Sequence, residues 1–161
     1  MLKKIFLIRH AEAAMPEGGM KDFDRPLTAS GIRDATHLGN YLAKKDVLPD
    51  IFLSSSALRT RQTSEEIALQ IKYEIQKISF KDRLYEPSVR ELLMEINQID
   101  KGNVLLMVSH NPSISYLAEY LSGEVIGNMP PGACVELDFS FDIWEAISEN
   151  SGMVANNYIP A

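Results

Sequence analysis

The chain has 161 residues, 45% of them apolar, and a formal net charge of −6. This length and composition predict one globular domain over residues 1–161. The acidic balance argues against a nucleic-acid partner, because such proteins carry a basic surface. The apolar stretch after the first two lysines, Ile5–Ile8, is shorter than a signal-peptide core, and no run approaches the ~20 apolar residues of a membrane span. We therefore expect a cytoplasmic protein without a membrane segment.

Strand and helix patterns alternate through the first part of the chain. Ile5–Ile8 is short, continuous and apolar, which is typical of a strand buried on both faces. The breaker-rich residues 15–20 follow, either as the rim of a pocket or as a plain surface loop. Thr28 is expected to cap a helix that ends near Lys44–Lys45. The apolar positions of this helix fall on one side: Ile32, Ala35, Leu38 and Leu42.

The middle of the chain continues the alternation. A second strand is predicted over Ile51–Leu53, after Pro49 and Asp50. The helix that follows, over Ala57–Ile71, is expected to take Ser55 or Ser56 as its cap. A third strand is predicted over Tyr73–Ile78.

Two more helices flank a second strongly apolar strand, which is predicted over Val104–Val108. The helix before it covers Ser88–Ile99 and turns three apolar side chains inward: Leu92, Leu93 and Ile96. The helix after it is expected to start with Asn111 as cap and Pro112 at its first position. Its buried side comprises Ile114, Leu117, Ala118 and Leu121.

The last forty residues have a different pattern. Short alternating segments predict antiparallel edge strands at Ala133–Phe139, Ile143–Ile147 and Val154–Ile159. Cys134 is the only cysteine, which excludes an intramolecular disulfide, and its place in an alternating segment indicates a buried rather than a reactive thiol. The fold class is α/β: a three-layer α/β/α sandwich with a mostly parallel central sheet and antiparallel edge strands.

Two histidines, His10 and His110, each follow directly on an apolar strand. The carboxyl ends of parallel strands meet at one edge of a sheet, where ligands bind in open α/β folds. Arg9 precedes the first histidine, and Arg59 lies in the first turn of the helix after the second strand. The helix N-termini after the second strand and after His110 also point to this edge, with free N–H groups for an anion.

Two imidazoles and two guanidiniums suit a phosphoryl group better than a carbonyl or a metal ion. A metal would require carboxylates or cysteines beside the histidines, so we expect neither a metal nor another cofactor. His10 is the candidate nucleophile, since the charge of Arg9 favours the neutral imidazole that can attack phosphorus. The remaining groups would hold the transferred phosphoryl group.

Four short blocks occur along the chain in a fixed order, and they are Arg9–Ala13, Asp24–Thr28 with Gly31, Ser55–Thr63 and Ser109–Pro112. Together they resemble the phosphoglycerate mutase-like histidine phosphatase superfamily. The short chain and the second block are most similar to its small branch, the SixA-type phosphohistidine phosphatases. The resemblance implies the same sandwich fold. It also implies that His10 forms a phosphohistidine intermediate and that Arg9, Arg59 and His110 bind the phosphate.

Further residues stand beside this pattern, namely Glu86, the pair Asp24 and Arg25 of the second block, Arg61 and His37. Glu86 is either the acid that protonates the leaving oxygen of a phosphate ester or a loop carboxylate before a proline. Asp24 and Arg25 match the second block and either shape the mouth of the pocket or brace the loop. Arg61 should face away from Arg59 on the same helix. His37 matches no block and is expected at the surface or in packing.

Only 51 positions separate Arg59 from His110, so the cap that encloses small substrates in larger members of the superfamily is missing. An open pocket favours a phosphohistidine side chain on a protein partner, such as a phosphorelay or phosphotransferase-system protein. A small-molecule phosphomonoesterase of the same superfamily is the first alternative. A non-catalytic module that binds phosphoproteins is the second, although binding alone would not require a nucleophile. The oligomeric state is not predicted.

Overall fold

The computed structural model describes residues 2–161. Its core is a six-stranded mixed sheet with the strand order β3-β2-β4-β1-β5-β6. The strands are β1 (Lys3–Arg9), β2 (Ile51–Ser55), β3 (Ser79–Lys81), β4 (Val104–Ser109), β5 (Cys134–Phe139) and β6 (Gly152–Tyr158). The first four lie parallel to one another, whereas β5 and β6 are added antiparallel at one edge. The predicted combination of a parallel centre and antiparallel edge strands is confirmed.

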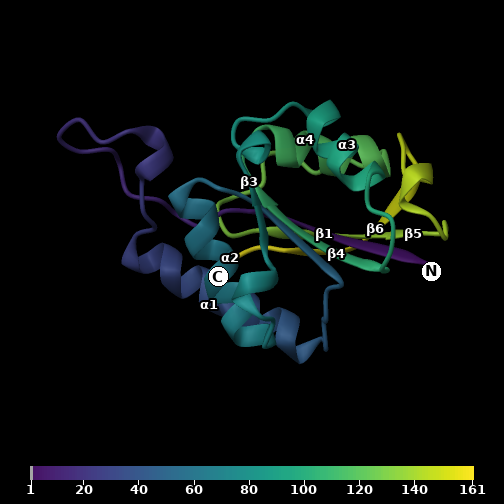
Figure 1. Ribbon diagram of the computed structural model, residues 1–161, viewed down its shortest axis with the longest axis horizontal. Coiled ribbons are helices and arrows are strands. Elements are labelled where there is room, and N and C mark those ends of the chain that lie inside the picture. The colour runs from purple at the N-terminus through teal and green to yellow at the C-terminus, as the bar shows by residue number, and fades with distance from the viewer. Residues whose placement is uncertain (1) are drawn as a thin grey trace.

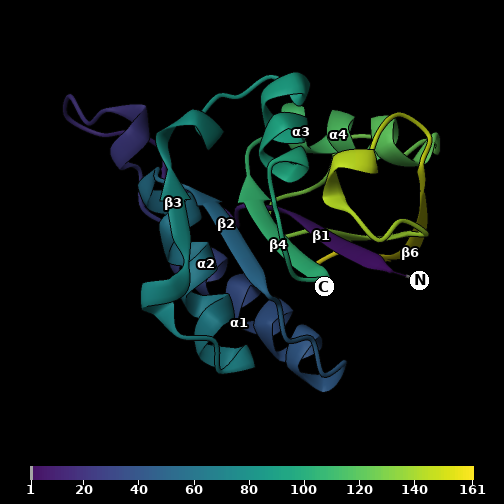
Figure 2. The same ribbon diagram turned by 45° about the vertical axis from the view of Figure 1, so that its right-hand side comes forward.

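Two pairs of helices cover the two faces of the sheet (Figures 1 and 2). Helices α1 (Ala29–Lys44) and α2 (Leu58–Ile71) lie on one face, and α3 (Val89–Asn97) and α4 (Ser113–Ser122) lie on the other. Each face has its own hydrophobic cluster, and residues of α3 and α4 occur in one cluster while residues of α1 and α2 occur in the other. The three-layer α/β/α sandwich expected from the sequence is thus confirmed.

The central strands are buried on both faces, as their continuous apolar sequences predict. In β1, Ile5 and Leu7 belong to the cluster under α3 and α4, whereas Phe6 and Ile8 belong to the cluster under α1 and α2. Strand β4 alternates in the same way. Arg9 is paired with Ser109 in the register of the two strands. The residues that follow this pair therefore leave the sheet side by side.

Two predicted strands are wrong. The segment Tyr73–Ile78 contains a 3-10 helix, Ile75–Lys77, and the edge strand β3 begins only after it. The segment Ile143–Ile147 likewise forms a 3-10 helix, Trp144–Ala146. There the buried indole of Trp144 donates a hydrogen bond to the carbonyl of Gly102, so tertiary packing overrides the alternating pattern.

The predicted helix starts are confirmed in part. The hydroxyl of Thr28 accepts a hydrogen bond from the Gly31 amide and caps α1. The N-cap of α2 is Ala57, which makes no side-chain cap bond, so neither Ser55 nor Ser56 has the predicted role. Asn111 does not cap α4 either, because Pro112 is the N-cap residue. The Asn111 side chain instead bonds Asn128, Met129 and Ser115.

Details of burial agree with most of the sequence analysis. The thiol of Cys134 is buried in β5, and burial raises its pKa. Leu92 and Ile96 of α3 are buried, and Leu93 is partly buried against the same cluster. Ile32 was expected on the buried side of α1 but is 41% exposed. No helix within residues 2–161 is long and apolar enough to cross a membrane.

Candidate active site

His10 and His110 meet at the carboxyl ends of β1 and β4. Their ring centroids are 5.2 Å apart, with an angle of 57° between the ring planes. The two residues are only 8% and 5% exposed. The backbone amide of His10 donates to the carbonyl of Ser109, which continues the strand pairing into the site. The convergence predicted from two separate strand ends is therefore present in the structure.

The hydrogen bonds of His10 define which ring nitrogen is free to react. Its Nδ1 lies 2.7 Å from the carbonyl oxygen of Ala11, which can only accept, so Nδ1 carries the proton. The guanidinium Nε of Arg59 donates to Nε2 over 3.3 Å. Burial and the neighbouring arginine charges lower the pKa of His10 to about 4. At neutral pH, His10 thus presents an unprotonated Nε2, as a nucleophile requires.

His110 and Arg9 bring two further nitrogen groups to the site. His110 Nε2 is hydrogen-bonded to the hydroxyl of Ser55 at 2.8 Å. Burial is the main cause that lowers the pKa of His110 to about 3, and the charge of a protonated His10 is the next cause. Arg9 donates one N–H to the carbonyl of Met129. Within residues 2–161, His110 Nδ1 and Arg9 Nε are buried without a hydrogen-bond partner. Buried polar atoms are normally paired, so Arg9 Nε–H fits an anionic ligand with acceptor oxygens, and His110 Nδ1 fits it in the tautomer in which the Ser55 hydroxyl donates to Nε2.

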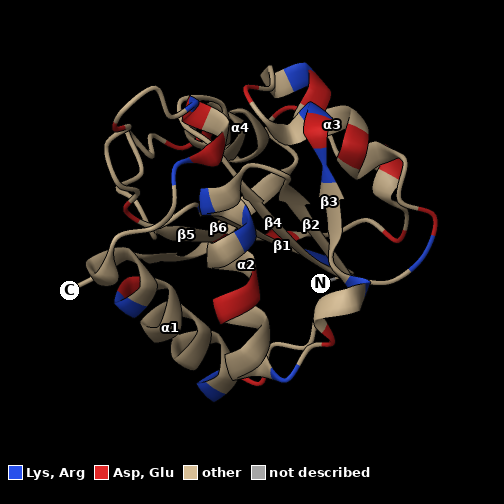
Figure 3. Cartoon of the chain, turned by 60° about the vertical axis from the view of Figure 1, so that its left-hand side comes forward, with Lys and Arg blue, Asp and Glu red and all other residues tan. Residues whose placement is uncertain are grey.

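Arg59 completes the group from the first turn of α2. Its side chain is 8% exposed, and it reaches from the helix across His10 to Asp22. Figure 3 shows that α2 carries its basic residues at one end and its acidic residues farther along. Positive side-chain charge therefore coincides with the positive end of the helix dipole. An anion such as a phosphate group is electrostatically suited to this place.

Asp22 and Tyr85 also belong to the site, and the sequence analysis missed both. Asp22 lies in a 3-10 helix, Asp22–Asp24, between β1 and α1, and its carboxylate accepts hydrogen bonds from Arg59 (3.0 Å) and from the hydroxyl of Tyr85 (2.6 Å). The ring of Tyr85 lies edge-on to that of His110, at 5.5 Å between centroids. Asp22 is close to the second sequence block, but no periodicity in a loop of this kind indicates where its side chain points.

The segment from Ala11 to Thr28 folds back on itself and thereby fixes Asp22. Ala13 and Leu27 form an antiparallel bridge. Arg25 donates to the Ala14 carbonyl and to the carboxylate of Asp22, so Arg25 both braces the loop and faces the site. Asp24 makes no side-chain hydrogen bond or ion pair within residues 2–161. Residues 15–20 are exposed, and the purple segment between β1 and α1 projects from the body of the protein in Figure 1.

The remaining candidates do not join the cluster. Glu86 is exposed, and its side chain forms no hydrogen bond or ion pair with other residues of the described chain. Its backbone is left-handed, with φ of 52°. Arg61 stacks its guanidinium on the ring of Phe80, 3.9 Å from the centroid, and so faces away from the site as predicted. His37 is exposed on α1.

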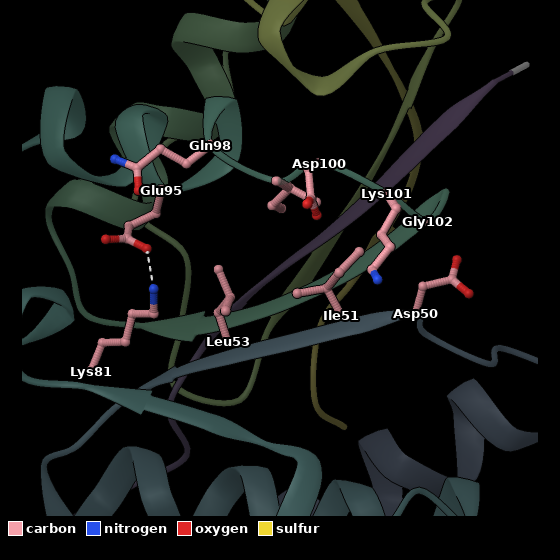
Figure 4. Close-up of a pocket in the computed structure, with 10 residues that line it drawn as sticks. Asp50, Ile51, Leu53, Lys81, Glu95, Gln98, Asp100, Lys101 and Gly102 are labelled. Carbon is pink, nitrogen blue, oxygen red and sulfur yellow. Dashed lines mark hydrogen bonds and ion pairs between the residues drawn. The ribbon is translucent and has the colours of Figure 1, made fainter.

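A separate cavity of about 540 Å³ opens between α3 and the β2–β3 edge of the sheet (Figure 4). Its lining includes the ion pair of Lys81 with the buried Glu95, at 2.7 Å. None of the four clustered candidates lines it. Within residues 2–161, no three histidine, cysteine or acidic side chains are grouped so that they could hold a metal ion.

Comparison with known proteins identifies the family. The model of the histidine phosphatase superfamily (branch 1) matches residues 5–89, more than half of the chain, and this part contains His10, Arg9, Arg59 and Asp22. The chain belongs to the histidine phosphatase superfamily. His110 lies beyond the matched part, and its place in the site comes from the structure.

Individual relatives match most of the chain. The Mycobacterium tuberculosis protein MT1313 is 35% identical over 71% of this chain and 70% of its own length. The phosphohistidine phosphatase SixA of Escherichia coli is 31% identical over 75% of this chain and 76% of its own.

Among solved structures, the SixA protein from Agrobacterium tumefaciens superposes with a TM-score of 0.86 at 25% identity, over 99% of both chains. A SixA structure with bound tungstate superposes with a TM-score of 0.84 at 23% identity, over 98% of this chain and 97% of the other, and shows the shared fold.

Proposed function

We propose that this protein is a phosphatase that removes the phosphoryl group from a phosphohistidine side chain of a protein partner. The observation that supports this most directly is the unprotonated Nε2 of His10, held among buried donors from Arg9, Arg59 and His110. The similarity to SixA proteins points the same way.

The proposed reaction has two transfers. The Nε2 lone pair of His10 forms a bond to phosphorus while the bond from phosphorus to the substrate nitrogen breaks, and that nitrogen keeps the electron pair. Water then attacks the phosphoryl group on His10, which restores the free imidazole and releases phosphate. In both steps, Arg9, Arg59 and His110 donate to the phosphoryl oxygens and stabilise their charge.

Two features favour phosphohistidine over a phosphate ester. An alkoxide leaves poorly without an acid. Asp22, the carboxylate that is hydrogen-bonded to Arg59 within residues 2–161, is ionised by its hydrogen bonds to Tyr85, Arg25 and Arg59, which lower its pKa. An imidazole whose far nitrogen is protonated leaves without such an acid. In addition, the chain between α2 and β4 holds only β3, α3 and two 3-10 turns, so no inserted cap encloses the substrate. The proposed partners are phosphorelay or phosphotransferase-system proteins, which implies a cytoplasmic location.

The test uses a histidine-phosphorylated protein domain and an aryl phosphate ester as parallel substrates, with a chelator present. We expect wild type to act far faster on the phosphohistidine and the His10→Ala variant to be inactive on both substrates. Hydrolysis of the ester alone would replace the proposal with a small-molecule phosphatase. If the folded protein binds the phosphorylated domain without turnover, the enzyme assignment is wrong and a binding module takes its place. Loss of activity with the chelator would contradict the expectation that no metal takes part.

A further inference from the structure

The outer side of the candidate site is formed by Asp22 and aromatic rings. The Asp22 side chain is 46% exposed, so the carboxylate is accessible from solvent at the mouth of the site. Tyr85 donates its hydroxyl to Asp22 Oδ2 and packs edge-on against Phe23, with 5.0 Å between centroids. None of these three side chains has a role in holding the phosphoryl group as described above. Their position indicates a place for the rest of the substrate.

The contacts of Arg59 allow Asp22 and a phosphoryl group to be present together. A guanidinium has five N–H donors. In Arg59, Nε–H donates to His10, one Nη1–H to the Asp22 carbonyl and one Nη2–H to the Asp22 carboxylate. Two N–H groups remain for phosphoryl oxygens, and Nε–H becomes a third once Nε2 of His10 bonds to phosphorus. Asp22 therefore orients Arg59 without competing for all of its donors.

A carboxylate beside aromatic rings is chemically matched to a cation with an N–H group. The imidazole of a phosphohistidine becomes such a cation when its far nitrogen is protonated. Cleavage of the bond from phosphorus to the near nitrogen then releases a neutral imidazole, which keeps the electron pair on the near nitrogen and the proton on the far one. Without that proton the ring would have to leave as an anion, which is a much poorer leaving group.

We propose that Asp22, with Tyr85 and Phe23 beside it, forms a leaving-group subsite that selects the protonated imidazole of phosphohistidine. Asp22 accepts a hydrogen bond from the far N–H of the substrate ring, and the charge pair stabilises the protonated form that reacts. The proton stays on the substrate throughout, so Asp22 acts as an ionised partner and not as an acid. The same carboxylate repels substrates whose leaving group carries negative charge. This inference rests on the proposed function and names its specificity residue.

The test compares Asp22→Asn with wild type on two small substrates, phosphoimidazole and an aryl phosphate ester, and uses kcat/KM for each. Asp24→Asn is the matched control, since it makes the same change in charge within the same 3-10 helix. For Asp22→Asn, we expect the ratio of kcat/KM on phosphoimidazole to kcat/KM on the ester to fall about ten- to a hundredfold. This is the range expected for the loss of one hydrogen bond between charged groups. Asp24→Asn should leave the ratio of the two substrates within about twofold.

The ratio distinguishes a specificity role from a structural one. Equal losses on both substrates in Asp22→Asn would mean that Asp22 only positions Arg59, and the inference would be wrong while the proposed function stands. A wild type that is inactive on phosphoimidazole and on a phosphohistidine protein would overturn both. Tyr85→Phe provides a second test because it keeps the ring but removes the hydroxyl that holds Asp22, and it should shift the ratio in the same direction by a smaller factor.

Discussion

Arg59 donates its Nε–H to Nε2 of His10 over 3.3 Å, so a residue from the start of α2 and a residue from the end of β1 share one hydrogen bond at the centre of the site. The bond keeps the lone pair of His10 directed toward the guanidinium that would also bind the phosphoryl group. The proposed nucleophile and the proposed phosphate-binding residue are thus aligned with each other in the free protein. Such preorganisation avoids reorganisation of the site during the reaction.

Replacing Arg59 with lysine should therefore cost more than the loss of one charge contact. Lysine keeps the positive charge but cannot donate to His10, Asp22 and phosphoryl oxygens at the same time. We expect kcat/KM to fall by about a hundredfold or more. Arg61→Lys is the control, because Arg61 stacks on Phe80 away from the site, and its activity should stay within about twofold of wild type. Equal losses in the two variants would contradict the assignment.

Activity should persist well below the ordinary titration range of histidine. Burial and the nearby arginines lower the pKa of His10 to about 4, so the reactive neutral imidazole is lost only when the pH approaches that value. We expect the acid limb of kcat/KM for an aryl phosphate, which is stable in acid, to lie near pH 4. A limb near pH 6.5, the ordinary value for histidine, that persists after the second ionisation of the ester itself is taken into account would show that His10 is not held neutral by its surroundings.

The same two histidines predict how stability depends on pH. The pKa of His10 falls to about 4 and that of His110 to about 3 in the folded protein, whereas both are near 6.5 in the unfolded chain. Between about pH 3 and pH 6.5 the unfolded chain binds more protons at these histidines than the folded protein does. The free energy of unfolding therefore rises with pH up to about 6.5 and falls as the solution is acidified. Urea unfolding at several pH values measures this, and the slope should decrease when His110 is replaced by glutamine.

Gly31 should not tolerate a side chain. A Cβ atom there would lie 2.1 Å from the carbonyl oxygen of Glu12, in the loop that carries Asp22. Because that atom is backbone, the loop itself must move, and Gly31→Ala should destabilise the protein by about 1–3 kcal/mol. Ser30→Ala, one position earlier, should change the free energy of unfolding by no more than about 0.5 kcal/mol. Urea unfolding of both variants tests the difference.

Glu86→Gln distinguishes phosphohistidine hydrolysis from hydrolysis of a phosphate ester. The Glu86 side chain is exposed and forms no hydrogen bond or ion pair with other residues of the described chain, so we expect phosphohistidine hydrolysis to change by less than about twofold. Ester hydrolysis is the informative comparison, measured on the same preparations. A selective loss on the ester would identify Glu86 as the acid of a second activity, whereas a loss on phosphohistidine would contradict its exclusion from the main reaction.

Several regular elements could be predicted from the sequence because their apolar runs were continuous or their cap residues were typical, and both agreed with the fold. The strands β1 and β4 and the cap at Thr28 are examples, and the strand register then brings His10 and His110 together. The errors at Tyr73–Ile78 and Ile143–Ile147 have another origin. Short apolar segments at the edge of a sheet are compatible with strand and 3-10 helix alike, and contacts such as the Trp144 indole bond decide between them.

Asp22 shows why one part of the candidate site could not be predicted from the sequence. Its place next to Arg59 depends on the path of an irregular loop, which is fixed by the Ala13–Leu27 bridge and by Arg25. No local pattern encodes such long-range pairings, so the sequence could identify the groups on strand ends but not the carboxylate that faces them.

The most direct test of the account is to stop turnover of a phosphohistidine substrate rapidly at alkaline pH and locate the phosphate on the enzyme by mass spectrometry of its peptides. We predict a phosphoryl group on His10 in wild type during turnover and none in His10→Ala. Turnover with no phosphorylated enzyme, or with the phosphoryl group on another residue, would contradict the assignment of His10 as the nucleophile.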